Sequence, residues 1–369
     1  MKVDYLRNIA DIQTGPFGSQ LHKDDYVEKG TPIVTVEHLG KRVFTEQNLP
    51  KVSDEDKERL KKYVLTKGDI VFSRVGSVDR CSYVDEAHVG WMFSGRCLRI
   101  RPLERIDSLY LYYYFCTEET KQFIRNIAVG ATMPSINTKL LGEVEINYPD
   151  IKIQKKIVKI LATIDNKIEK NITINKNLAD QAQTIYQQYF VAEANPDWPL
   201  GHLSDLIDIK YGKDHKKLAD GTYPVYGSGG IMRYVERPLY EKESVLIPRK
   251  GTLNNVIYVN QPFWSVDTMF YTEMKQDNVA KFVYHYVKSK DLASMNAGSA
   301  VPSMTTAILN ALELPLPSIE ALKHFEVSVA PMYEMMQKNE EESHKLAKLR
   351  DALLPKLISG EIDVSALSL

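Results

Sequence analysis

The sequence predicts an α+β fold with a pseudo-two-fold internal repeat: two globular domains separated by an antiparallel coiled coil of two long helices. Two observations lead to this prediction. Residues 110–190 align without a gap with residues 278–358 at a constant offset of 168, and the start of the chain repeats at an offset of 197, where Leu6–Gly15 matches Leu203–Gly212. Each copy also ends in a long segment with an apolar heptad pattern, which is typical of coiled coils.

Each globular region is predicted to be rich in short strands. In the first region, apolar runs bounded by turn residues predict strands at 33–36, 69–75, 97–101 and 144–148, and helices at 53–63 and 108–126. In the second region, the same patterns predict strands at 244–247, 256–259 and 269–274, and a helix at 279–289. Because the offset falls from 197 to 168, the first region is 29 residues longer, and most of the excess lies between Gly30 and Arg74.

Two long helices are expected after Pro149 and Pro317, because proline suits a helix start. Their heptad seams include these positions: Ile157, Ile164, Asn171, Asn175, Leu178 and Ile185 in the first helix, and Phe325, Met332, Asn339, Ser343, Leu346 and Leu353 in the second. Antiparallel pairing predicts that Asn175 meets Asn339 and that Ile157 lies near Leu357. Two independent amphipathic helices are the alternative. Pro355 is expected to stop or kink the second helix by Leu353 or Leu354.

Composition narrows the class of protein. The 369 residues suit two to three domains, and 47 basic against 48 acidic residues give a net charge of −1, whereas a self-sufficient DNA-binding protein is usually basic. The longest apolar run, 109–116, is too short to span a bilayer, and we expect no signal peptide. Cys81, Cys97 and Cys116 fit neither a disulfide framework nor a zinc site, so we expect free thiols in the cytoplasm and no bound metal.

Enzymatic motifs are almost absent. Neither a P-loop nor a G-x-G-x-x-G motif occurs, and no Ser-His-Asp context stands out. Asp197, Asp208 and Lys210 mimic the spacing of a metal-dependent nuclease. However, Asp208 aligns with Asp11 of the first copy, which lacks the other two residues. We therefore expect Asp208 to be a structural turn or cap residue, and we predict no catalytic residue in this chain.

The strongest local signals are glycine-containing loops, which let a backbone approach a ligand closely. One matched pair, Arg74–Ser77 and Arg249–Thr252, follows a predicted strand in both copies, where an arginine can reach a phosphate or a guanine edge. Because both copies share it, the pair is expected to grip the DNA backbone; a turn arginine in a surface ion pair is the alternative. The candidate DNA-binding residues are Gly15, Phe17, Gly18, Ser19, Arg74, Gly76, Ser77, Arg96, Tyr226, Ser228, Arg249, Lys250, Gly251 and Thr252.

Two further groups of residues are basic or aromatic. Arg96, Arg99 and Arg101 alternate along a predicted strand and could line one basic face, although solvated edge charges are an equally good interpretation. The aromatic cluster at 110–115 is expected to form helix core and not a platform for stacked bases.

The whole chain resembles the DNA-sequence specificity subunit of type I restriction–modification systems. The resemblance rests on the two-copy layout, on Gly15–Ser19, on Tyr223–Gly230, on Gly130-x-x-x-Pro134-Ser135 and on the segment Leu349–Glu361. It implies target-recognition domains at residues 1–150 and 192–317, coiled-coil helices at 151–191 and 318–358, and a C-terminal tail at 359–369. Pseudo-two-fold symmetry of this kind is also the symmetry of duplex DNA.

The same resemblance implies partners instead of cofactors. Two adenine-N6 methyltransferase subunits would dock on the helices, and two restriction subunits would join through them. S-adenosylmethionine would then belong to the methyltransferase, ATP and Mg²⁺ to the restriction subunit, and none of them to this chain. The alternatives are the same reader in a methylation-only system and, from a different class, a Mg²⁺-dependent nuclease.

Overall fold

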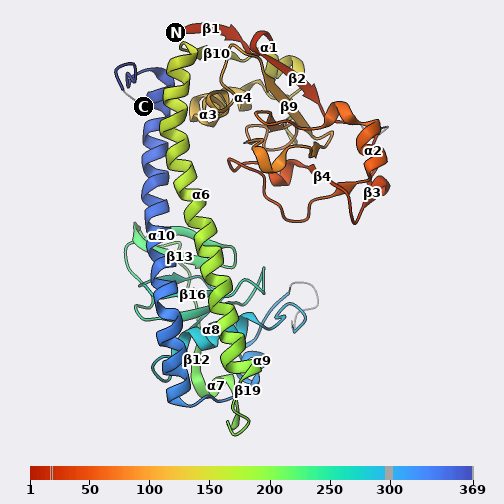
Figure 1. Ribbon diagram of the computed structural model, residues 1–369. Coiled ribbons are helices and arrows are strands. Elements are labelled where there is room, and N and C mark those ends of the chain that lie inside the picture. The colour runs from red at the N-terminus through yellow and green to blue at the C-terminus, as the bar shows by residue number, and fades with distance from the viewer. Residues whose placement is uncertain (17, 19, 296–301, 368–369) are drawn as a thin grey trace. The chain divides into compact units, whose positions relative to one another are not determined.

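A computed structural model describes residues 1–16, 18, 20–295 and 302–367 of the chain (Figure 1). It divides into two compact units. Unit 1 comprises Met1–Lys170 and Glu342–Leu369, and unit 2 comprises Asn171–Glu341. Each unit therefore contains one globular region and a stretch of both long helices, α6 (Ile151–Gln187) and α10 (Ile319–Ser359), which we call the helix pair. A π-helical turn, Gln188–Ala192, follows α6.

The main sheet of unit 1 is antiparallel and has the strand order β2-β9-β6-β7. A second sheet, β3-β5-β4-β8, contains one parallel pair, β4 with β8, and a ribbon pairs β1 with β10. The strands are β1 Lys2–Tyr5, β2 Ala10–Thr14, β3 Tyr26–Val27, β4 Thr31–Val34, β5 Lys51–Val52, β6 Ile70–Ser73, β7 Cys81–Tyr83, β8 Met92–Phe93, β9 Cys97–Pro102 and β10 Glu145–Tyr148. The short helices are α1 Leu6–Ile9, α2 Asp54–Arg59, α3 Ser108–Cys116, α4 Glu118–Ile127 and α5 Thr138–Gly142.

Unit 2 repeats this plan with fewer residues. Its main sheet, β12-β18-β15-β16, has the same order as the main sheet of unit 1, and its second sheet, β14-β13-β17, keeps one parallel pair, β13 with β17. The strands are β11 Leu200–His202, β12 Ile207–Tyr211, β13 Asp220–Gly227, β14 Gly230–Val235, β15 Ser244–Pro248, β16 Ile257–Val259, β17 Trp264–Ser265, β18 Met269–Met274 and β19 Glu313–Pro315. The short helices are α7 Leu203–Leu206, α8 Ala280–Lys288 and α9 Thr306–Asn310.

The helix pair is antiparallel in each unit, where α6 and α10 lie side by side (Figure 1). In unit 2 the Asn339 amide donates to Asn175 Oδ1 at 2.8 Å, and the Asn175 amide donates to the Met336 carbonyl oxygen at 2.9 Å. In unit 1, Ile157 and Leu357 share one buried core. The predicted contact between Asn175 and Asn339 is confirmed, and the antiparallel α+β fold class with an internal repeat is as expected.

Apolar residues of the helix pair complete the core of each globular region. Leu161 and Leu357 join the core that lies under the main sheet of unit 1, and Phe325 and Val329 do the same in unit 2. Burying such side chains stabilises a fold by about 1.5–3 kcal/mol each. The helix pair is therefore part of both domain cores, and the alternative of independent helices, each packed only on its own domain, does not hold.

Two local predictions were wrong. The helix expected at 108–126 is broken at Thr117, whose hydroxyl oxygen accepts the Thr120 N–H and caps a second helix, α4. Pro355 does not stop α10 at Leu353 or Leu354, because the helix continues to Ser359. Pro355 and Asp351 are exposed, so solvent can satisfy the carbonyl that proline leaves unpaired, while buried Leu357 and Ile358 hold the last turn against the core.

Candidate nucleic-acid interface

The arginine loop of unit 1, residues 74–77, leaves the end of β6 and is held mainly by backbone hydrogen bonds. The Arg74 N–H donates to the Arg96 carbonyl at 2.9 Å, and the Arg74 carbonyl accepts the Ile136 N–H at 2.9 Å. The Arg74 guanidinium is half-buried, and its Nη1 donates to the Gly95 carbonyl oxygen at 3.1 Å. The loop thus connects the main sheet to the turn before β9.

The arginine loop of unit 2, residues 249–252, repeats these contacts one for one. The Arg249 N–H donates to the Thr268 carbonyl at 2.8 Å, and the Arg249 carbonyl accepts the Met304 N–H at 2.9 Å. Its Nη1 donates to the Asp267 carbonyl oxygen at 3.2 Å, and the guanidinium lies over the Tyr211 ring at 5.4 Å from its centroid. Among the described residues, Arg249 makes no ion pair with a carboxylate, so the alternative of a surface ion pair does not hold for the arginine of unit 2.

The glycine of each arginine loop is needed for its backbone conformation. Gly76 has φ +74° and Gly251 has φ +87°, a region that favours glycine. The turn brings the residue before each glycine into a β-bridge: Val75 with Ser135, and Lys250 with Ser303. In both units, therefore, the arginine loop lies against the Pro-Ser segment that the two copies share, Pro134-Ser135 in unit 1 and Pro302-Ser303 in unit 2. Gly76, Ser77, Lys250 and Thr252 are exposed there.

Gly15 has a different role from the one expected. It is buried, and a Cβ at this position would lie 2.1 Å from the Ser94 carbonyl oxygen. Its counterpart Gly212 would place a Cβ 2.0 Å from the Val266 carbonyl oxygen. Both glycines let two backbone segments of the protein pack together, so the interpretation of Gly15 as a ligand-approach residue is corrected. Gly18 is exposed with open space around it, whereas Phe17 and Ser19 lie outside the described residues.

Tyr226 also requires a correction, because its side chain is core and not surface. It is 8% exposed, its ring meets Phe263 edge to face, and its hydroxyl oxygen accepts from Gln261 Nε2 at 3.4 Å. Burial raises the pKa of this hydroxyl. Ser228 lies in the following turn and is half-buried, and its carbonyl oxygen accepts the Asn255 amide at 2.7 Å. The Ser228 turn therefore lies against the arginine loop of unit 2.

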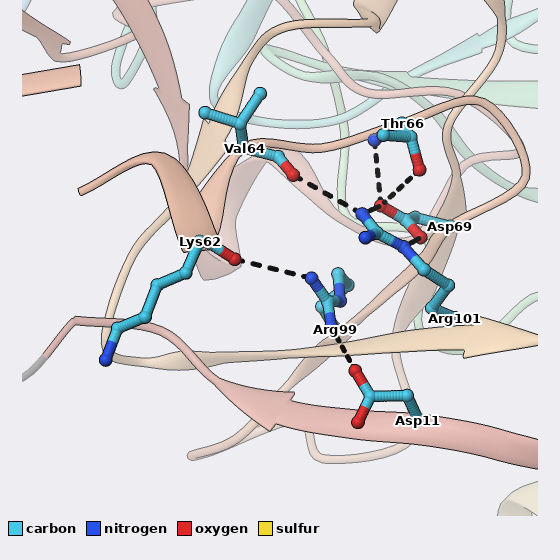
Figure 2. A network of polar contacts seen from close by, with 7 residues as sticks. All are labelled: Asp11, Lys62, Val64, Thr66, Asp69, Arg99 and Arg101. Carbon is cyan, nitrogen blue, oxygen red and sulfur yellow. Dashed lines mark hydrogen bonds and ion pairs between the residues drawn. The ribbon is translucent and has the colours of Figure 1, made fainter. Parts of the chain in front are cut away.

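The basic face proposed for β9 is neutralised by ion pairs, as Figure 2 shows. Buried Arg99 pairs with Asp11 of β2, and Arg101 makes two contacts of 2.7 Å with Asp69, whose side chain is fully buried. The hydrogen bond to Asp69 raises the pKa of Arg101, whereas burial lowers that of Arg99. Only Arg96 of this series is exposed, and it lies in the turn that contacts Arg74.

The nuclease-like residues do not form a metal site. Asp208 lies in β12 and pairs with Lys275 at 3.2 Å and Lys210 at 3.8 Å, while Asp197 is exposed in the segment before β11. Among the residues that the structure describes, no group of three or more His, Cys, Asp or Glu side chains could hold a metal ion. Asp208 is structural, as expected, but as a strand ion pair and not as a turn or cap.

Sequence reasoning missed one matched position directly after the arginine loops. The N–H groups of Arg80 and Asn255 donate to the Ser77 and Thr252 carbonyl oxygens, both at 3.1 Å, so the two residues occupy the same place in the two units. Their side chains differ completely. The constant offset of 175 between the two loops could have identified this pair.

Comparisons with known proteins agree with this two-copy arrangement. A family model described as the type I restriction modification DNA specificity domain matches residues 2–178 and 195–338. The type I restriction enzyme MjaIX specificity subunit of Methanocaldococcus jannaschii is 24% identical over an alignment of 312 positions, which covers 73% of this chain and 72% of that protein. The HindI specificity subunit of Haemophilus influenzae is 22% identical over an alignment of 415 positions, which covers 82% of this chain and 88% of that protein.

Among solved structures, the S subunit of a type I restriction–modification system from M. genitalium has a similar fold. The TM-score is 0.63 at 19% identity, and the match covers 96% of this chain and 95% of that one. Among the described residues, we find no helix that is both long enough and apolar enough to span a membrane.

Proposed function

The chain belongs to the family of the type I restriction modification DNA specificity domain, and we propose that it reads a split, asymmetric DNA target for a methyltransferase. The observation that carries the proposal is the repetition of one loop assembly in both units: an arginine loop, a Pro-Ser segment and a turn that accepts the arginine N–H. Two such assemblies on one chain suit two separate DNA elements. The chain itself is a non-catalytic DNA-recognition subunit.

We assign different tasks to shared and unshared residues of these loops. Arg74 and Arg249 occupy identical backbone positions, so they suit contacts with phosphates, which are the same at every site. Two pairs of residues share a backbone position but differ in their side chains: Arg80 with Asn255, and Arg96 with Thr268. Side chains that differ between the units suit base edges, because sequence is read there.

The partners follow from this function. We propose that two adenine-N6 methyltransferase subunits dock on the chain in the cytoplasm and bring S-adenosylmethionine, and that two restriction subunits with ATP and Mg²⁺ join through them. The net charge of −1 supports a need for such partners, because phosphate contacts by basic residues dominate non-specific DNA affinity. The second candidate is a methylation-only system with the same reader.

Methylome sequencing of cells that express the chain with its methyltransferase tests the proposal. We expect methylated adenines in two short elements of different sequence, separated by several unread base pairs. A continuous or palindromic motif would contradict it. Deleting the restriction-subunit gene and measuring plasmid restriction distinguishes a complete system from a methylation-only one.

A further inference from the structure

In unit 1, one residue of the globular region is hydrogen-bonded into the helix pair by a buried side-chain network. Tyr113 of α3 is 1% exposed, and its hydroxyl donates to Asp165 Oδ2 of α6 at 2.7 Å. Arg350 of α10 donates through Nη1 to Asp165 Oδ1 at 2.9 Å. The Asp165 side chain is 6% exposed. This polar lock 1 therefore joins three helices through one buried carboxylate.

Unit 2 also contains a buried network between its domain helix and both long helices, with a different central residue and different chemistry. His285 of α8 is 1% exposed, and its Nδ1 lies 2.8 Å from Gln183 Oε1 of α6. Because that oxygen can only accept, Nδ1 carries the proton, and Nε2 accepts the Tyr333 hydroxyl of α10 at 2.8 Å. We call this network polar lock 2. It too joins the domain helix to both long helices.

The two locks occupy related positions of the repeat. At the offset of 168, Tyr113 aligns with Lys281 and Asp165 aligns with Tyr333. Lys281 precedes His285 by one helical turn, is 5% exposed, and pairs with Glu326 of α10 at 2.6 Å and with Glu243 at 2.9 Å. The same faces of α3 and α8 thus contact the helix pair, through a carboxylate in one unit and through a neutral imidazole and an ammonium in the other.

Buried hydrogen bonds of this kind hold an orientation more strictly than apolar contacts do. Apolar burial is non-directional, so a domain could tilt on the helix pair with little change in buried area. Hydrogen bonds require defined distances and angles, and a tilt would leave buried groups such as Asp165 without partners. The locks therefore define one angle between each globular region and its own stretch of the helix pair.

We propose that polar locks 1 and 2 are positioning elements that set which distance between the two DNA elements the protein accepts. Tyr113 and Tyr333 act through orientation and contact no DNA in this proposal. The inference rests on the proposed function, since only a split target has a spacing to select. Loosening either lock should broaden the accepted spacing without changing the bases that are read.

The test uses the assembled methyltransferase and a plasmid library that carries the target at every spacer length from two base pairs below to two above the native one. Tyr113→Phe and Tyr333→Phe each remove one lock hydroxyl and keep the buried ring. Tyr148→Phe and Tyr286→Phe are matched controls, because those buried tyrosines bond to Asp4 Oδ2 at 2.8 Å and to the Glu313 carbonyl at 2.7 Å, inside their own globular regions.

We expect the lock variants to lose about fivefold of the discrimination against spacers one base pair too long or too short, the factor that one net hydrogen bond can supply. The half-site sequences should stay unchanged, and the controls should keep the native spacer profile even where their thermal stability falls equally. Equal spacer profiles in all four variants would overturn the inference. A wild-type assembly that methylates no split target would instead overturn the proposed function.

Discussion

Polar lock 2 makes the stability of unit 2 sensitive to acid, and this can be worked out from His285. Burial, assisted by the charge of Lys288, lowers the pKa of His285 from 6.5 to about 3. The folded pKa is below the unfolded value, so the stabilisation is fully present above pH 6.5 and is lost as the pH falls toward 3. At those lower pH values the unfolded chain gains a proton that the folded chain cannot accept.

The magnitude follows from linkage between protonation and folding. A pH of 5.0 is about 1.5 units below the pKa of the imidazole in the unfolded chain. Protonation of the unfolded chain therefore lowers the free energy of unfolding by about 2 kcal/mol relative to pH 7.5. This figure is the same for any folded pKa from 2 to 4, because the folded imidazole remains neutral at pH 5.0. Other titrating groups add their own contributions, which a variant can subtract.

Urea unfolding of the full chain at pH 7.5 and 5.0 measures the effect. With Trp91→Phe as the background, the remaining tryptophans, Trp198 and Trp264, lie in unit 2, so their fluorescence reports this unit. His285→Gln keeps a donor and an acceptor but cannot titrate. We expect its loss of unfolding free energy between the two pH values to be about 2 kcal/mol smaller than that of the background protein. An equal loss in both proteins would refute a buried neutral His285.

Two further predictions concern the loops. Gly15→Ala should destabilise unit 1 by about 3 kcal/mol, because the added methyl group would overlap the Ser94 carbonyl oxygen, and a backbone atom cannot move aside as a side chain can. Gly18→Ala should be nearly neutral, because open space surrounds Gly18. A thermal melt in which Gly18→Ala is the less stable variant would restore the interpretation of Gly15 as a ligand-approach residue. Arg74→Ala and Arg249→Ala should each weaken DNA binding by the assembled methyltransferase and reduce its salt slope by about 1, with Arg125→Ala of α4 as the control. If either variant relaxed one base position in the methylome, that arginine would be a base reader.

The repeat and the heptad seams were enough to predict the fold class, because both are periodic signals that need no tertiary information. They also predicted the pairing of Asn175 with Asn339, since an antiparallel seam relates opposite positions by a constant sum. The break at Thr117 was missed because the polar residues after it, 118–122, suit an exposed turn of one continuous helix equally well. Its cap is a single hydroxyl, which competes locally with helix propagation.

The candidate site was predicted less completely, because exposure depends on long-range pairing. Tyr226 lies directly before the glycine-rich segment Gly227–Gly230, which suggests a surface loop. However, β13 pairs in parallel with β17, and this pairing buries Tyr226 beside Ser265. The locks were invisible for a similar reason, since Tyr113 and Asp165 are 52 residues apart. One signal was available: Arg350 occupies a seam position where an apolar residue is expected, and a charge there implies a buried partner.

The backbone of the arginine loops suits the proposed reading of two unrelated DNA sequences by one fold. In both units the loop is held by main-chain bonds from the arginine to the neighbouring turn and to the Pro-Ser segment. These bonds do not depend on the side chains at Arg80 and Asn255 or at Arg96 and Thr268. The side chains at Arg80, Arg96 and Thr268 can therefore change without loss of these main-chain bonds, whereas Gly76 and Gly251 cannot, because their positive φ favours glycine. Selection for new DNA targets would act on the first group alone, which predicts that the two halves of the target share no sequence.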